Sequence, residues 1–198
     1  MAHKIYIKKL KDPKDIKLFQ KTFNDILGYS TVPYEYFESG DCHAMFDGDK
    51  MVAGFCLVRG FYNLRSIMQL PLSVIGFLRH KQHIVKSLAD FTGYFISNKK
   101  YGLRFTIYLV KTCLLHPCNY FVYSYLVTEY GLERYYGSGK PLRIHTGAPE
   151  HLPGHHSVME PEHVEILSKW GIVRIFLYRT KRWVKSWFRR KKHVSKEG

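Results

Sequence analysis

A hairpin predicted at residues 42–58 is the feature that most constrains the fold. Two apolar runs, in residues 42–46 and 51–58, are separated by the polar turn Asp47-Gly48-Asp49. A short turn that contains glycine suits the twist of antiparallel strands. The sequence therefore predicts a sheet that begins with antiparallel pairing.

Other regular elements alternate around this hairpin. A strand is predicted over residues 3–10, and a helix follows, with Asp12 as N-cap, Pro13 in its first turn and Gly28 at its end. Strands are predicted over 88–97, 118–128 and 140–147, and a helix over 129–139. Residues 61–87 mix a short strand, a proline break and a helix. After residue 148 we expect a polar loop and then a short helix that begins after Pro161.

The charge of the chain limits its partners. Thirty-one Lys and Arg against sixteen Asp and Glu give a formal net charge of +15. A field of this sign attracts anions, so the partner is expected to be acidic. Nucleic acid, an anionic membrane, a phosphorylated cofactor and an acidic carrier protein all meet this description.

The composition also bears on location. The four cysteines include no C-x-x-C pair, and no apolar run approaches the roughly 18 residues of a membrane-spanning helix. The first residues become charged too early for a signal peptide. These features predict reduced thiols and a cytoplasmic protein, with peripheral attachment at the inner face of the membrane left open.

The stretch from residue 88 to 117 predicts a strand, a basic turn and a helix. The start of a helix offers free backbone N–H groups and the positive end of the helix dipole, which bind phosphate. Two interpretations fit the turn: a phosphate-binding site or an ordinary solvated turn. Its residues are Asn98, Lys99, Lys100, Tyr101, Gly102, Leu103 and Arg104.

The order of these elements, from about Lys4 to Gly147, resembles the GNAT acyltransferase superfamily. In that family the turn reads Q/R-x-x-G-x-G/A and holds the cofactor pyrophosphate; here only Gly102 of the two small residues is present. "EYGLERYYGSG" is similar to the family pattern L-Y-x-x-x-G-F. "DFTGY" resembles a diverged form of the E-L-S-R strand of the acyl-homoserine-lactone and N-acyl amino acid synthases.

The resemblance implies an α/β (α+β) fold with a mixed, mostly antiparallel central sheet flanked by helices. It covers an acyltransferase core (1–147). Changes in composition after this core predict a His- and Pro-rich loop with a short helix (148–171) and a basic amphipathic C-terminal helix and tail (172–198).

The resemblance also implies a site in which an amine attacks a thioester directly. Asp90 would deprotonate the amine, the backbone amides of Phe95 and Ile96 would stabilise the oxyanion, and Tyr135 or Tyr136 would protonate the departing sulfur. The spacing to Gly139 favours Tyr135, whereas the aromatic doublet favours Tyr136. A structural carboxylate at Asp90 and a packed aromatic face at the tyrosines are the alternatives.

No tightly bound cofactor is implied; the co-substrate would be acyl-CoA or an acyl carrier protein (acyl-ACP). The missing glycine and the positive charge favour the carrier protein, and the acceptor would be an amino acid, a small amine or a peptide side chain. Segment 61–87 would form either the wall of an acyl tunnel or part of the core. Its apolar residues are Ile67, Met68, Leu70, Leu72, Val74, Ile75, Phe77 and Leu78.

The C-terminal segment, the histidines and the basic, aromatic-rich composition give three further expectations. In the C-terminal segment, aromatic and aliphatic residues share one side and Lys and Arg the other, as in helices that bind membrane surfaces or pack on a domain. Histidines at 151, 155, 156 and 163 lack metal-site spacing, so no metal is expected. A basic, aromatic-rich nucleic-acid-binding protein is the alternative function, but the chain carries none of the common motifs for it.

Overall fold

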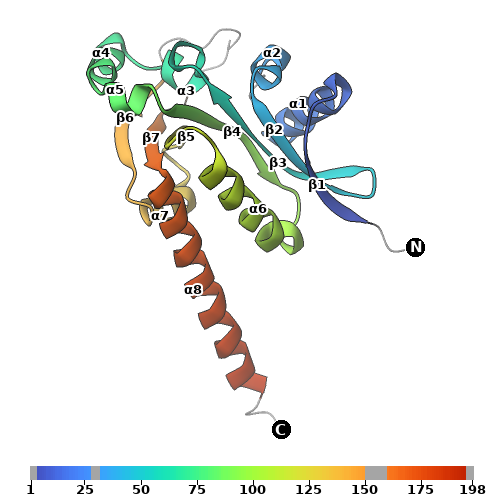
Figure 1. Ribbon diagram of the computed structural model, residues 1–198. Helices are drawn as coiled ribbons and strands as arrows, with labels where there is room; N and C mark the ends of the chain where they lie inside the picture. The colour runs from blue at the N-terminus through green and yellow to red at the C-terminus, as the bar shows by residue number, and fades with distance from the viewer. Residues whose placement is uncertain (1–3, 28–31, 150–159, 195–198) are drawn as a thin grey trace.

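A computed structural model describes residues 4–27, 32–149 and 160–194. Seven strands form one twisted sheet in the order β1-β2-β3-β4-β5-β7-β6 (Figure 1). All neighbouring strands are antiparallel except β4 and β5. The strands are β1 (Ile5–Lys9), β2 (Asp41–Asp47), β3 (Lys50–Arg59), β4 (Leu88–Ile96), β5 (Tyr120–Leu126), β6 (Leu142–Gly147) and β7 (Glu162–Ser168). The mixed, mostly antiparallel sheet predicted from the sequence is confirmed.

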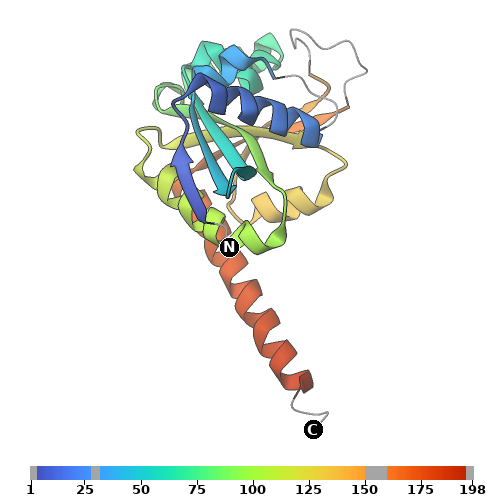
Figure 2. The same cartoon turned by 90° about the vertical axis from the view of Figure 1, so that its right-hand side faces the viewer.

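Helices cover both faces of this sheet (Figures 1 and 2). One face carries α1 (Pro13–Leu27), α2 (Tyr34–Glu38), η1 (Phe61–Asn63), α3 (Arg65–Met68), α4 (Leu72–His80) and α5 (Gln82–Val85). The other carries η2 (Lys99–Tyr101), α6 (Gly102–Leu115), α7 (Tyr130–Gly137) and the start of α8 (Lys169–Val194). Each face has its own apolar core, and α8 continues past the edge of the domain as a long helix.

Local sequence explains the elements that were predicted well. The hairpin turn brings Asp47 opposite Lys50, and Gly48 has a positive φ of 61°, which glycine adopts without strain. At the start of α1, Asp12 Oδ1 accepts a hydrogen bond from the Lys14 N–H at 2.9 Å, as an N-cap residue does. The hairpin and the first helix are therefore confirmed.

Three predictions about segment boundaries need correction. Residues after Pro161 form β7, not a helix, and β7 lies between β5 and β6, so the sheet extends beyond residue 147. The C-terminal helix begins at Lys169 rather than at residue 172. Residues 61–87 contain four short helical pieces and no strand. The predicted loop at residues 150–159 lies outside the described residues.

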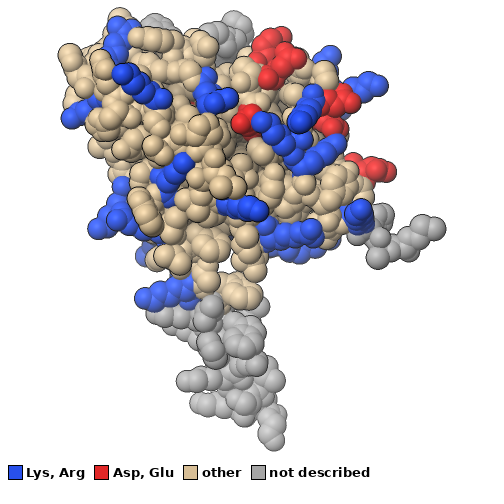
Figure 3. Space-filling model, viewed as in Figure 1, with Lys and Arg blue, Asp and Glu red and all other residues tan. Residues whose placement is uncertain are grey.

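The two regions of the surface in Figure 3 differ in charge. Acidic side chains gather over the part of this face that carries α1 and α2, whereas the area over α6 and α8 shows basic and uncharged side chains. The sequence explains this difference, because residues 91–128 and 166–196 contain no Asp or Glu.

Candidate active site

The candidate site is bordered by a bulge in β4. Gly54 of β3 pairs with Phe95 and Cys56 pairs with Thr92, so β4 has one extra residue opposite Phe55. Gly93 lies in this bulge with φ +66°, and a Cβ on it would approach Phe19 to 2.9 Å. Glycine is therefore required there by conformation and by space.

The bulge changes which side chains share a face. Residues three apart on a regular strand point to opposite faces. With the extra residue between them, Phe91 and Tyr94 both line the same cavity. The cavity lies where β4 and β5 diverge, since their paired register covers only Leu88 to Asp90 on β4.

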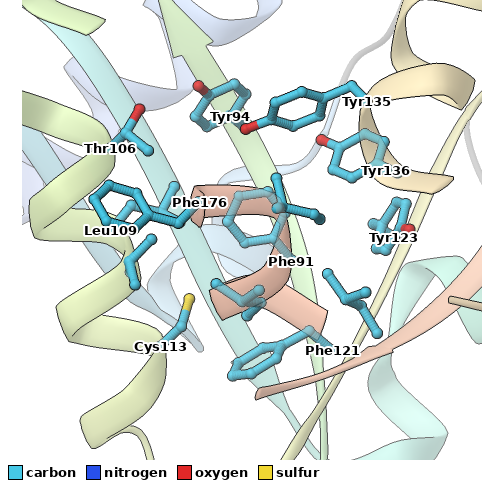
Figure 4. Close-up of a pocket in the computed structure, with 14 residues that line it drawn as sticks. Phe91, Tyr94, Thr106, Leu109, Cys113, Phe121, Tyr123, Tyr135, Tyr136 and Phe176 are labelled. Atoms are coloured by element: carbon cyan, nitrogen blue, oxygen red, sulfur yellow. The ribbon is translucent and has the colours of Figure 1, made fainter. Parts of the chain in front are cut away.

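The cavity is almost entirely apolar and has an empty volume of about 580 Å³, including the part open to solvent. Strands β4, β5 and β7 form its floor, and α6, α7 and α8 form its walls (Figure 4). Its lining residues are Phe91, Tyr94, Thr106, Leu109, Val110, Cys113, Phe121, Tyr123, Tyr135, Tyr136, Leu167, Ile172, Ile175 and Phe176. Segment 61–87 contributes none of them; Ile67, Leu70 and Leu78 are buried in the core on the other face.

The two ends of the cavity differ in polarity (Figure 4). The hydroxyl groups of Tyr94, Tyr135 and Tyr136 gather at one end, together with Thr106. Cys113 and Phe121 lie at the opposite end. Thr106 and Cys113 are seven residues apart on α6, which corresponds to about 10 Å along the helix axis. The cavity therefore has the shape of a slot with a polar end and an apolar end.

Arg179 of α8 binds the polar end. Its Nη1 donates to Tyr135 Oη at 3.1 Å and to Thr106 Oγ1 at 3.3 Å. Burial raises the pKa of Tyr135, while the positive charge of Arg179 acts against this shift. Tyr136 packs against the ring of Tyr123 at a centroid distance of 4.4 Å, and burial raises its pKa as well. Of the two candidate tyrosines, Tyr135 thus has a cation at its hydroxyl.

Asp90 lies on the opposite face of the sheet from these tyrosines. It is 1% exposed and accepts hydrogen bonds from Tyr36 Oη at 2.6 Å, Ser66 N at 2.9 Å and Ser66 Oγ at 2.9 Å. Burial raises the pKa of Asp90, and these hydrogen bonds act against the shift. The carboxylate therefore ties α2 and α3 to β4.

An N-acyl amino acid synthase and an N-acetyltransferase are among the solved structures with a similar arrangement of strands and helices. FeeM, an N-acyl amino acid synthase from uncultured soil microbes, matches with a TM-score of 0.61 at 13% identity, over 84% of this chain and 93% of that chain. NAA60 of Arabidopsis thaliana, in complex with acetyl-CoA, matches with a TM-score of 0.57 at 11% identity, over 83% of this chain and 98% of that chain. No family model and no curated protein matches the sequence.

The chain has the GNAT acetyltransferase fold. Because the identities are this low, the similarity establishes the fold and leaves the reaction to be inferred from the residues.

The turn at residues 98–104, which was predicted to hold a phosphate, is a capped helix start. Asn98 Oδ1 accepts from the Lys100 N–H at 2.9 Å, so this amide is occupied. Lys100 Nζ lies 3.5 Å from Asp47, and Arg104 donates to the Ile5 carbonyl at 3.2 Å. A Cβ on Gly102 would meet no atom within 4 Å, so there is open space beside the first turn of α6.

The other turn residues also have defined positions. Tyr101 is buried and its hydroxyl donates to Asp47, whereas Lys99 and Leu103 are exposed. Positive charge is thus present at the start of α6, but part of it is neutralised within the domain.

The two backbone amides predicted for the oxyanion point in different directions. Ser97 N donates to Val52 O at 2.9 Å, and N–H groups along an antiparallel strand alternate between its two sides. The Phe95 N–H therefore points to Gly54 of β3, with which Phe95 is paired. The Ile96 N–H points to the side where β4 and β5 diverge. Of the two, Ile96 is the donor that faces the gap.

Sequence reasoning missed a buried carboxylate, paired with a half-exposed arginine, beside the cavity. Glu165 is 2% exposed, and its carboxylate accepts from Arg143 Nε at 2.9 Å and from Tyr123 Oη at 2.8 Å. Arg143 also binds Glu133 of α7 at 2.9 Å. The alternation of His163, Glu165 and Leu167 on one side of a strand would have been the signal, had residues 162–168 been assigned as a strand.

The described residues were searched for a metal site and for a helix that could span a membrane. Within residues 4–27, 32–149 and 160–194, no three His, Cys, Asp or Glu side chains gather closely enough to hold a metal ion. His151, His155 and His156 lie outside the described residues; His163 Nδ1 is 2.9 Å from Thr146 Oγ1. None of the helices in the described part of the chain is long and apolar enough to span a bilayer.

Proposed function

We propose that this chain is an N-acyltransferase that moves an acyl group from a thioester to an amine. The observation that carries the proposal is the slot between β4, α6 and α8, with tyrosine hydroxyls at one end and an apolar lining along the rest. An acyl chain would fill the apolar part, and the thioester would then lie beside the hydroxyl groups.

The residues at the polar end supply the groups that this reaction needs. As the amine attacks the thioester carbonyl, negative charge develops on its oxygen, and the Ile96 N–H would donate to it. Tyr135 would give its proton to the sulfur as the carbon–sulfur bond breaks, and Arg179 would stabilise the resulting phenolate. The attacking nitrogen would release its proton to water, and the phenolate would take up a proton from water in turn. Tyr136 would shape the slot through its contact with Tyr123. No covalent enzyme intermediate is needed.

We assign Asp90 a positioning role in place of general base. Three donors surround its carboxylate, and it lies on the face away from Tyr135. By fixing α3 against β4 just before the bulge, it would hold the strand from which the Ile96 N–H donates.

The start of α6 favours a phosphate-bearing donor. Lys99, Lys100 and Arg104 lie at the end of α6 nearer Thr106, and therefore at the polar end of the slot. The phosphate of CoA or of a carrier protein's pantetheine would lie there while its acyl chain extends toward Cys113. NAA60 was solved with acetyl-CoA, which supports a CoA thioester; the net charge of +15 supports an acidic carrier protein.

The test is a chain-length series. Purified protein is incubated with CoA thioesters from acetyl to palmitoyl, or with the corresponding acyl-ACPs, and with a panel of amino acids and small amines; amide products are detected by mass spectrometry. We expect long-chain donors to react faster. Cys113→Phe should remove that preference and spare transfer of the acetyl group, which serves as the internal control.

Two results would contradict the proposal. If no donor gives an amide while RNA binds saturably, the chain is a nucleic-acid-binding protein. If Cys113→Phe slows all donors equally, the acyl chain does not extend along α6.

A further inference from the structure

We propose that the surface formed by α6 and α8 binds an anionic lipid bilayer. This inference concerns a surface outside the slot and does not depend on acyl transfer.

The two helices lie side by side and run in opposite directions. Thr106, near the start of α6, contacts Arg179 of α8, and Cys113, near the end of α6, lines the slot together with Ile172, near the start of α8. Their inner sides line the slot. Their outer sides carry exposed residues and are covered by no other element in the described part of the protein.

Large apolar side chains are exposed on this surface. On α8, Trp170 is 74% exposed and Leu177 is 59% exposed; they lie seven residues apart on one stripe of the helix. On α6, Leu103, Ile107 and Leu114 share a stripe on the flank toward α8, and Leu115 is 74% exposed. A soluble domain rarely concentrates exposed apolar residues in this way without a partner.

Basic residues alternate with the apolar ones. Arg174 and Lys181 fall on the same exposed stripe of α8 as Trp170 and Leu177, at steps of four, three and four residues. Arg104 and Lys111 occupy the outer face of α6. Neither helix contains an Asp or Glu. Figure 3 shows this area without acidic side chains.

This combination fits a bilayer surface better than other acidic partners. Tryptophan and leucine enter the boundary between headgroups and acyl chains, while Lys and Arg extend to the phosphates. RNA bases could stack on Trp170, but neither RNA nor the acidic surface of a carrier protein would give Leu177 and Ile107 an apolar environment. Juxtaposed basic residues strengthen binding to anionic lipids in a salt-dependent manner.

The experiment is co-sedimentation of the full chain with vesicles of phosphatidylcholine alone and of phosphatidylcholine with phosphatidylglycerol, at low and high salt. We expect binding to the anionic vesicles that weakens at high salt. Trp170→Ser with Leu177→Ser, and separately Arg174→Glu with Lys181→Glu, should each lower the partition coefficient about tenfold or more. Thermal unfolding checks that each variant is folded.

The matched control is Lys14→Glu with Lys21→Glu on α1, two exposed residues on the other face of the sheet. It makes the same change in net charge as the Arg174 and Lys181 pair, and should lower binding much less. Three results would overturn the proposal: absence of vesicle binding, an equal loss in the control, or vesicle binding unchanged in both α8 variants. Tight binding of RNA or a carrier protein in place of vesicles would overturn it as well.

Discussion

The two faces of the sheet differ in what they bury: one encloses a hydrogen-bonded carboxylate, and the other leaves an apolar slot unfilled. On the face covered by α1 to α5, the carboxylate of Asp90 is enclosed and receives three hydrogen bonds. On the face covered by α6 to α8, an apolar slot is left unfilled, with tyrosine hydroxyls at one end. A satisfied buried carboxylate fixes one arrangement of the chain, whereas an empty apolar slot costs stability. We infer that the first face is the scaffold and the second is the site.

The largest effect is expected from Asp90→Ala. Removal of the carboxylate leaves the Ser66 N–H, the Ser66 hydroxyl and the Tyr36 hydroxyl buried without an acceptor, and should lower the free energy of unfolding by about 3–5 kcal/mol. Urea denaturation measures this change.

Asp90→Asn distinguishes a scaffold residue from a base. The amide keeps the shape and part of the hydrogen bonding, so we expect a smaller loss of stability and turnover within about tenfold of the wild type. A folded Asn variant with turnover reduced about a thousandfold would show that Asp90 is the general base after all.

On the site face, Tyr135→Phe should reduce the rate of acyl transfer about a hundredfold, which corresponds to about 2.7 kcal/mol. The variant keeps the ring and loses only the hydroxyl that Arg179 contacts. Tyr136→Phe is the matched control and should reduce the rate much less, with both variants unfolding at the same urea concentration as the wild type. If Tyr136→Phe reduced the rate more than Tyr135→Phe, Tyr136 would be the residue that protonates the sulfur.

The comparison of the two faces also shows what the sequence could predict. Alternating apolar residues and the glycine turn at Gly48 act locally, so the hairpin and the strand–helix–strand unit were predictable. β7 was not, because Pro161 and the acidic residues around His163 are typical of a helix start. It forms a strand because it pairs with β5 on one edge and with β6 on the other, where Glu165 lies opposite Arg143.

The geometry of the candidate site could be predicted only in part, because it too depends on distant parts of the chain. Tyr135 and Tyr136 could be named from the resemblance, but the direction in which a strand residue points depends on the register and the bulge at Gly93. Asp90 therefore fell on the scaffold face, and Arg179 could not be linked to Tyr135 before α8 was placed.

One buried group on each face, His43 and Asp90, should make the stability depend on pH with opposite signs. On the site face, burial lowers the pKa of His43 to about 4; its ring stacks on Phe55 and its Nδ1 lies 2.8 Å from Tyr108 Oη. As the pH falls below about 6.5, the unfolded chain binds a proton at His43 and the folded protein does not, so stability is lost, by roughly 2–3 kcal/mol between pH 7 and pH 4.

Ionisation of Asp90 is linked to the free energy of unfolding with the opposite sign. Its pKa is raised in the folded protein, so the folded state binds its proton first and this group favours folding as the pH falls. Urea denaturation at several pH values should show the His43 contribution vanish in His43→Gln. An unchanged slope in that variant would mean that other groups set the acid sensitivity.

The smallest effect is expected from adding volume at the slot. Cys113→Leu enlarges a fully buried side chain that borders empty space, so the free energy of unfolding should change by less than about 1 kcal/mol. Ala44→Leu makes a similar addition in the closed core of the other face, where the enlarged side chain must displace its neighbours, and should cost about 1–3 kcal/mol. Equal losses in the two variants would show that the slot is as closely packed as the scaffold, and the division between the two faces would then no longer hold.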